Sequence, residues 1–337
     1  MGDMILTAPL FAALKQHFPR ARLSVLASPA NAQVAAHCPA VDAVVVDAVE
    51  ARHSGWRGII ALSRRLRQLN IDVILFANAK HRMALAAWLA RIPVRIGSAR
   101  RGYSLLYSAR VAAADTGHET DRVLRLLEPL GVAPSIAQSH WRVADAEACA
   151  VDGVLAAAQV PAGGRIAAIH PSNSGNALTG SPEWYAQLGD TLVSNGYAVV
   201  LTGTGEDRPL VRAILQRMRQ PAFDLTGRFS IPELAALYAR CAVCIASSTG
   251  PAHLAAVVGA PTIGLYAPLV QQERWVPRGP AVRILRPPIE MRCARCRGPR
   301  CEFFNCLNLI APERIVAVAA ELQADREGRS TPSEERH

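Results

Sequence analysis

Short apolar strands alternate with helical segments twice along this chain, and no other feature restricts its fold as strongly. The first series of strand-length apolar runs comprises residues 22–28, 42–47, 71–77 and 94–99. The series begins again with 165–171, 197–205, 242–247 and 261–268. Such alternation indicates parallel strands with helices on both faces. We therefore predict an α/β fold of two Rossmann-like domains, at 1–150 and 160–322, followed by a polar tail at 323–337.

The composition is that of a globular protein. Half of the 337 residues are hydrophobic, yet no apolar run reaches the roughly 18–20 residues that span a bilayer. The N-terminus lacks a basic-then-apolar secretory signal, so we expect a cytoplasmic protein. A net charge of +10 fits anionic partners, including a membrane surface, as well as a solvated arginine-rich surface. Nucleic acid is disfavoured, because aromatic residues are scarce and not interleaved with basic ones.

The stretch CIASSTGPAH places small hydroxyl residues between a buried strand and a helix expected to start near Pro251. Free amides in the first turn of a helix favour a phosphate, and Gly250 would let the backbone approach it. Alternatively, Ser248 or Thr249 caps an ordinary helix. His253 could contact a ligand oxygen or serve as a structural partner.

Ligands of open parallel sheets bind beyond the carboxyl ends of the strands. Five of the six loops in such positions lie in the second half of the chain, which we therefore expect to bind a nucleotide. The loop LTGTGED places Glu206 beside two glycines, where a carboxylate could accept ribose hydroxyls. A nicotinamide dinucleotide is disfavoured, because the third glycine of its fingerprint is missing.

Two further features carry candidate chemistry. Asp3 stands at the start of the first predicted helix, either as its N-cap or as a general base. The sequence CARCRGPRCEFFNC spaces four cysteines closely, at Cys293, Cys296, Cys301 and Cys306. This spacing predicts a structural zinc site, with reduced thiols or disulfides as the alternatives.

Several blocks of the chain resemble glycosyltransferase family 9, the heptosyltransferases of lipopolysaccharide core assembly. They are GDMILTAPLFAALKQHFP, IHPSNSG, YAVVLTGTGEDR and residues 224–268, in the family's order, followed by the cysteine group. The resemblance covers roughly residues 2–322, and 224–268 is its most specific part. It implies a GT-B fold, in which two Rossmann-like domains face each other across a cleft.

The resemblance also implies an inverting transfer of a sugar, typically heptose from an ADP-sugar, to a lipopolysaccharide inner-core acceptor. Asp3 would be the general base, and no metal would take part in the chemistry. The acceptor would lie against the N-terminal domain and the donor against the C-terminal one. The expected donor-binding residues are Ser172, Thr202, Gly203, Thr204, Glu206, Arg228, Ser248, Thr249, Gly250, Pro251, Ala252 and His253. Contact with the cytoplasmic face of the inner membrane would be peripheral.

Three departures from the family pattern matter. No strand precedes Gly2-Asp3, so we expect the first central strand of the N-terminal domain to be missing from this chain. Ser248 stands where many members carry an aspartate, and no lysine precedes the helix predicted from Pro182. Arg228 could supply the missing positive charge to a phosphate. A nucleotide-sugar-binding protein without transferase activity is therefore the alternative function.

Overall fold

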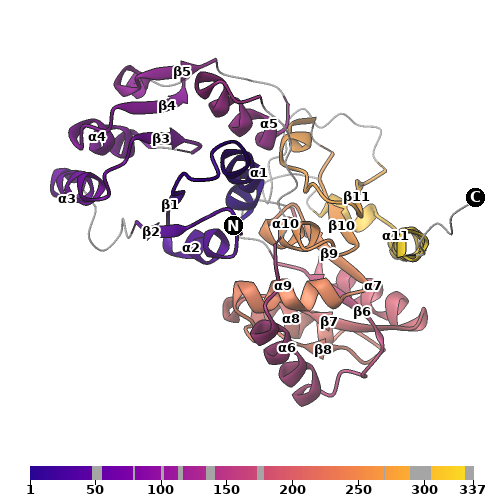
Figure 1. Cartoon of the computed structure of the whole chain (residues 1–337). Helices are drawn as coiled ribbons and strands as arrows, with labels where there is room; N and C mark the ends of the chain where they lie inside the picture. Colours follow the sequence, from indigo (N-terminus) through magenta and orange to yellow (C-terminus); the bar gives the residue numbers. More distant parts are fainter. Residues whose placement is uncertain are drawn as a thin grey trace, which may run out of the picture. The chain divides into compact units, whose positions relative to one another are not determined.

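The structure is a computed structural model that describes residues 1–47, 55–78, 80–99, 102–112, 117–133, 141–172, 178–268, 270–288 and 305–330. The chain divides into two compact units near residue 139 (Figure 1). Among the described residues, no helix combines the length and the apolar character needed to cross a bilayer.

The N-terminal unit alternates helices and strands, as the sequence predicts. Its helices are α1 (Gly2–His17), α2 (Pro29–Ala36), α3 (Gly55–Gln68), α4 (His81–Leu89) and α5 (Glu119–Leu124), with 3-10 turns η1 (Gly102–Leu106) and η2 (Arg125–Leu130). Its strands are β1 (Ser24–Ala27), β2 (Ala43–Val46), β3 (Val73–Phe76), β4 (Val94–Ser98) and β5 (Ala109–Val111). All strand pairs in this unit are parallel.

The strands of the N-terminal unit form two separate sheets, β1–β2 and β3–β4–β5. Helix α1 packs against both of them. Its Ala8 and Phe11 join an apolar cluster with Val25 and Ala27 of β1, whereas Leu10 and Ala13 join a cluster that contains residues of β4 and β5. The described residues place no strand between β1 and β3.

The C-terminal unit contains one continuous parallel sheet of six strands in the order β11–β10–β9–β6–β7–β8. The strands are β6 (Arg165–His170), β7 (Tyr197–Leu201), β8 (Phe223–Asp224), β9 (Val243–Ser247), β10 (Thr262–Leu265) and β11 (Val282–Leu285). The helices are α6 (Asp145–Ala157), α7 (Pro182–Ser194), α8 (Arg208–Leu215), α9 (Ile231–Arg240), α10 (Gly250–Val257) and α11 (Pro312–Ser330), with 3-10 turns η3 (Gly205–Asp207), η4 (Val270–Trp275) and η6 (Cys306–Leu309).

Local sequence signals explain where the helices of this unit begin. Ser230 caps α9 in a reciprocal box, in which its own N–H donates to the Glu233 carboxylate at 2.7 Å. Ser181 caps α7 by accepting from the N–H of Trp184 at 3.3 Å, and Pro182 occupies the first turn. The chain leaves α7 at Gly196, whose φ of +82° favours glycine.

Two predicted boundaries differ from the structure. The units divide after Ser139, so residues 140–150, which we assigned to the first domain, belong to the second. The reason is that α6 packs on α9, where the Arg240 guanidinium pairs with the carboxylate of Asp152. The tail predicted from residue 323 is wrong as far as Ser330, because α11 continues to that residue.

Candidate active site

The strand order of the C-terminal unit reverses between β6 and β9. From β6 the chain continues outward to β7 and β8, and from β9 it continues in the other direction to β10 and β11. The loops after β6 and β9 therefore diverge, and this point is where open parallel sheets bind their ligands. Ser172 follows β6, and Ser248 to Gly250 follow β9. The structure thus brings two of the predicted donor-binding segments to adjacent strand ends.

Helix α10 begins at Gly250 without a side-chain cap. Thr249 is its N-cap residue, but the Thr249 hydroxyl donates backwards to the carbonyl oxygen of Ser247 at 3.2 Å. Pro251 occupies the first turn. A helix capped by the hydroxyl of Thr249 is therefore not what the structure shows. The positive end of the α10 dipole keeps its affinity for an anion.

A buried histidine connects the ends of β6 and β7. The two nitrogens of the His170 ring lie 3.2 Å from the hydroxyl of Ser172 and 3.0 Å from the hydroxyl of Thr202. Burial lowers the pKa of His170 to about 4, and the Asp207 carboxylate opposes this shift. The ring is therefore neutral near pH 7. It accepts one hydrogen bond and donates the other, which fixes both hydroxyls that we predicted to contact the donor.

Three buried tyrosines lie near the carboxyl ends of these strands. The hydroxyl of Tyr238 lies 3.4 Å from that of Thr202, and the hydroxyl of Tyr185 lies 3.4 Å from that of Ser247. The Tyr266 hydroxyl donates to the Trp275 carbonyl at 3.0 Å. Burial raises the pKa of Tyr266 to about 12, so its hydroxyl keeps its proton. Strand-end hydroxyls therefore rest on neutral hydrogen-bonding groups.

The glycine loop after β7 packs tightly against the loop after β8. The N–H of Gly227 donates to the carbonyl of Gly203 at 2.8 Å, and the φ of Gly227 is +69°. A Cβ atom at Gly203 would lie 2.9 Å from the Cβ of Asp207, so glycine is required there. The Asp207 carboxylate accepts from the N–H and the hydroxyl of Thr204, at 2.6 and 2.7 Å. Glu206, in the first of these loops, remains exposed and available to a ligand.

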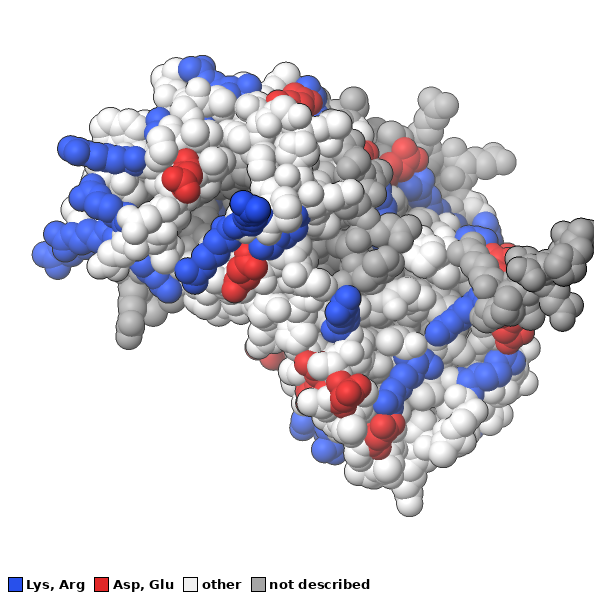
Figure 2. All heavy atoms as spheres, in the orientation of Figure 1, with Lys and Arg blue, Asp and Glu red and all other residues white. Residues whose placement is uncertain are grey.

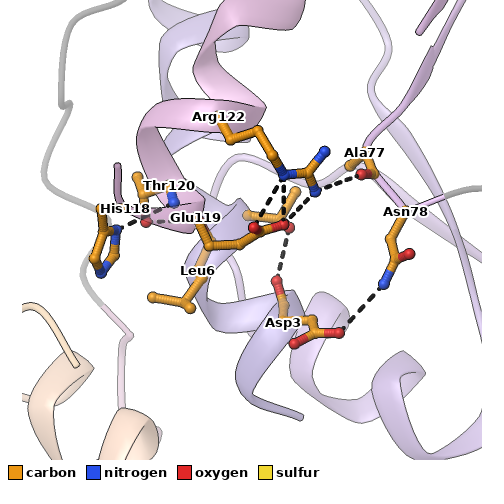
Figure 3. A network of polar contacts seen from close by, with 9 residues as sticks. Asp3, Leu6, Ala77, Asn78, His118, Glu119, Thr120 and Arg122 are labelled. Atoms are coloured by element: carbon orange, nitrogen blue, oxygen red, sulfur yellow. Dashed lines mark hydrogen bonds and ion pairs between the residues drawn. The ribbon is translucent and has the colours of Figure 1, made fainter. Parts of the chain in front are cut away.

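The N-terminal unit presents Asp3 in the first turn of α1. Met1 occupies the N-cap position, so the interpretation of Asp3 as the helix cap is wrong. The Asp3 side chain is exposed and accepts a hydrogen bond of 3.2 Å from the side-chain amide of Asn78 (Figure 3). Asn78 follows the end of β3, so the carboxylate lies at the carboxyl edge of that strand.

An ion pair from α5 supports this strand end. Arg122 binds the Glu119 carboxylate through Nε at 2.9 Å and also through Nη2. The same Nη2 donates to the carbonyl of Ala77 at 3.1 Å, next to Asn78 (Figure 3). The sequence analysis did not identify Asn78, Glu119 or Arg122. A polar residue directly after the apolar run VILFA is the signal that would have found Asn78.

The chain matches the family Glycosyltransferase family 9 (heptosyltransferase) over residues 59–305. It is 26% identical over 290 residues to lipopolysaccharide heptosyltransferase 3 of Escherichia coli (strain K12), covering 79% of each chain. A crystal structure of the family 9 glycosyltransferase from Veillonella parvula DSM 2008 has a TM-score of 0.85 at 20% identity, covering 96% of this chain and 95% of that one. E. coli ADP-heptose lps heptosyltransferase II has a TM-score of 0.79 at 20% identity, with 97% and 96% covered.

This chain belongs to glycosyltransferase family 9. The predicted family and the predicted GT-B fold of two Rossmann-like units are confirmed. A family 9 heptosyltransferase needs a donor site and a base, and the structure assigns the candidate residues for these tasks to different units. The donor candidates lie in the C-terminal unit, at the ends of β6, β7, β8 and β9. Asp3 lies in the N-terminal unit.

The structure describes two of the residues at which this chain differs from the family pattern. Ser248 stands where the resemblance led us to expect an aspartate, and it partly opposes the rise that burial causes in the pKa of Tyr266. Arg228, our candidate for the missing positive charge, is exposed three residues before α9 begins. His253 is buried, at 5% exposure, and its contact with a ligand stays a prediction.

Three cysteines of the candidate zinc cluster lie outside the described residues. Only Cys306 is described, and it is buried beside Leu307 in the main apolar cluster of the C-terminal unit. Within the described part of the chain, no group of three metal-ligating side chains occurs. The zinc site therefore stays a prediction.

Proposed function

We propose that this chain transfers heptose from ADP-heptose to an inner-core sugar of lipopolysaccharide, with inversion and without a metal ion. The observation that carries the proposal is the N-terminus of α10, which has no side-chain cap and lies at the point where the strand order reverses. A diphosphate suits this position, because it satisfies free amides and the helix dipole together. Family membership and the names of the relatives support the sugar and the acceptor.

The reaction needs two groups from the chain. The Asp3 carboxylate takes the proton from the acceptor hydroxyl, whose oxygen forms the new bond to the anomeric carbon. The bond from that carbon to the diphosphate breaks on the opposite face, and ADP leaves with the electron pair. Amides in the first turn of α10 stabilise the growing negative charge as fixed donors. Asn78 orients the carboxylate through the hydrogen bond to Asp3.

Calorimetric titration with ADP, ADP-heptose, UDP and a UDP-hexose tests the donor site. We expect ADP ligands to bind and Thr249→Asp to weaken them at least about tenfold, because its carboxylate would occupy the helix N-terminus. The same variant should be as stable as the parent or more so, since aspartate is a good N-cap. Thr249→Ser is the matched control and should bind normally.

The titration also separates the competing functions. A preference for UDP would keep the class of enzyme but reject heptose as the sugar. ADP-heptose binding without ADP release in the presence of acceptor would favour the alternative, a nucleotide-sugar-binding protein without transferase activity. Full activity after treatment with a chelator would support metal-independent transfer. If no nucleotide binds, the transferase proposal is wrong.

We propose that Cys293, Cys296, Cys301 and Cys306 hold a structural zinc ion, separate from the chemistry. The spacing of four thiols within fourteen residues supports it. Mass spectrometry of the native protein should find one zinc ion per chain. Cys293→Ser should remove it, and Cys149→Ser, at an exposed cysteine outside the cluster, should not.

We also propose a cytoplasmic protein in peripheral contact with the anionic inner membrane. A lipid-linked acceptor and the net charge of +10 support this contact. Such binding is electrostatic in part, so it should weaken as the salt concentration rises.

A further inference from the structure

Exposed large apolar side chains are concentrated in the N-terminal unit. Of nine among the described residues, one, Leu309, belongs to the C-terminal unit. The other eight are Phe18, Val46, Trp56, Ile60, Leu69, Val73, Trp88 and Leu105. Single exposed apolar residues are ordinary on a soluble surface, but such a bias toward one unit indicates a site of interaction.

Four of these residues project from three neighbouring elements. Trp56 and Ile60 are one turn apart on α3, Trp88 lies in the last turn of α4, and Leu105 lies on η1. Their exposed fractions are 69%, 43%, 50% and 76% respectively. We call these four residues, together with the arginines named below, the α3–α4–η1 surface.

The three elements form one packed layer. Helices α3 and α4 share an apolar cluster that includes Leu62 of α3 and Ala87 of α4, and the two helices lie side by side in Figure 1. Arg67 of α3 donates to the carbonyl of Leu89 in α4 at 2.7 Å. The turn η1 packs on the same cluster through Leu106. The surface therefore stays assembled without a partner.

The charged side chains within helices α3 and α4 are all basic. Helices α3 and α4 contain no aspartate or glutamate. Arg57, Arg64 and Arg67 of α3 are exposed, as is Arg91 directly after α4. Figure 2 shows Lys and Arg side chains projecting from the part of the N-terminal unit that these helices form. An anionic partner with an apolar layer beneath its charges fits such a surface.

We propose that the α3–α4–η1 surface docks on an anionic phospholipid bilayer. Tryptophan prefers the level of the lipid headgroups, and a guanidinium binds lipid phosphate with two parallel hydrogen bonds. A second copy of this chain fits less well, because self-pairing would place arginine against arginine. The inference rests on the proposed function only in that a lipid-linked acceptor requires the enzyme at a membrane.

Sedimentation with vesicles tests the surface directly. The full chain should bind vesicles of phosphatidylglycerol and phosphatidylethanolamine and leave vesicles of phosphatidylcholine alone unbound. The triple variant Trp56→Ser, Trp88→Ser, Leu105→Ser should lose at least about tenfold in binding, since each side chain contributes apolar area. Arg57→Gln or Arg64→Gln should each lose about fivefold, which corresponds to about 1 kcal/mol per basic residue.

Matched controls come from the other unit. Leu309→Ser removes an exposed apolar residue there, and Arg219→Gln removes an exposed arginine there. Both should bind vesicles as the parent does. Equal losses in surface and control variants would mean that net charge and general hydrophobicity, and not this surface, determine binding, and the proposal would be wrong.

Tryptophan fluorescence gives a second readout. Trp56 and Trp88 are exposed, Trp141 and Trp184 are buried at 9% and 3%, and Trp275 of the C-terminal unit is half-buried. Brominated phospholipid should therefore quench the parent protein and have little effect on Trp56→Phe, Trp88→Phe. Absence of quenching would overturn the proposal. The proposal would also be wrong if the protein does not bind vesicles but forms a dimer that these variants disrupt. Neither assay contains donor or acceptor, so both test the surface independently of the reaction. A chain that binds vesicles but releases no ADP would contradict only the proposed transferase activity.

Discussion

The two Rossmann-like units are built from similarly apolar strands but bury them differently. In the C-terminal unit, all five residues of β9 and the last five of β6 are buried. In the N-terminal unit, β1 and β3 read SVLA and VILF, yet two residues of β1 and one of β3 are buried. A parallel sheet normally has both faces covered. The difference therefore lies in the surroundings of the strands and not in their sequence.

The position of β6 explains this difference. In the C-terminal unit, β6 pairs with both β7 and β9 and joins the two halves of the sheet. The corresponding position in the N-terminal unit would lie between β1 and β3. The described residues place no strand there, so β1 and β3 are both edges. Helix α1 connects the two sheets, through Ala8 and Phe11 on one side and Leu10 on the other, and Leu26 of β1 also packs against the cluster that contains Phe76 of β3.

The candidate site reflects the same contrast. The donor half rests on buried groups, such as His170 and Tyr238, within a continuous sheet. The half with the candidate base places an exposed carboxylate, Asp3, on the first turn of a helix that connects two separate sheets. We infer that the donor half is the more rigid of the two, and that the position of the base depends on how firmly α1 is held.

Replacing the base should give the largest effect. Asp3→Asn is expected to lower kcat about 10²- to 10⁴-fold, because the amide cannot accept the proton. ADP affinity and the free energy of unfolding should hardly change, since the side chain is exposed and its described side-chain contact is with Asn78. Measurement of ADP release, together with calorimetry, checks both expectations. Asp72→Asn, at the amino end of β3, is the control. Unchanged turnover in Asp3→Asn would remove Asp3 from the chemistry.

Joining the two N-terminal sheets should have the next largest effect. A chain extended before α1 by a short apolar strand such as Val-Ile-Val-Val should gain about 2–4 kcal/mol in free energy of unfolding. Burial of four side chains outweighs the ordering of four residues. Denaturant unfolding measures the gain, and an extension of Gly and Ser of equal length is the control. Equal stability of the two chains would show that the edges of β1 and β3 do not accept a strand.

The stability of the protein should depend on pH through the buried His170 of the C-terminal unit. The pKa of His170 is about 4 in the folded protein against 6.5 in the unfolded chain. Below pH 6.5 the unfolded chain binds a proton that the folded protein does not. Stability is therefore lost from about pH 6.5 down to about pH 4, by up to about 3 kcal/mol.

The variant His170→Asn isolates this effect from the other histidines. Asparagine keeps hydrogen-bonding capacity toward Ser172 and Thr202 but does not titrate. Unfolding of the two proteins in urea, at a series of pH values, should give curves that diverge below pH 6.5. Parallel curves would mean that the pKa of His170 is the same in the folded protein as in the unfolded chain.

The sequence predicted most strands of both units and the loops that follow them, because apolar runs bounded by turn residues are local signals. It missed β5, β8 and β11, which lie at sheet edges. A two-residue strand such as β8 exists only because β7 pairs with it. Pairing of that kind leaves no local pattern in the sequence.

The residues of the candidate site also fall into two groups, those that the sequence predicted and those that it missed. Asp3 and the loop from Ser248 to Gly250 carry recognisable local patterns. The supporting partners do not, because Asn78 lies 75 residues from Asp3, and Tyr238 lies 36 residues from Thr202. Only the folded sheet brings such residues together, so the sequence predicted candidate ligand-binding groups and missed the residues that hold them in place.

Matched valine substitutions should give the smallest effects and measure the contrast between the sheets. Val199 of β7 is fully buried, whereas Val73 of β3 is 40% exposed. We expect Val199→Ala to cost about 2–3 kcal/mol in free energy of unfolding, through lost burial and the cavity left behind, and Val73→Ala less than about 0.5 kcal/mol. In the chain extended by an apolar strand, the cost of Val73→Ala should rise to about 1–2 kcal/mol, because the added strand would cover β3. A cost that stays the same in the extended chain would mean that the added strand does not lie beside β3, whatever it contributes to stability elsewhere.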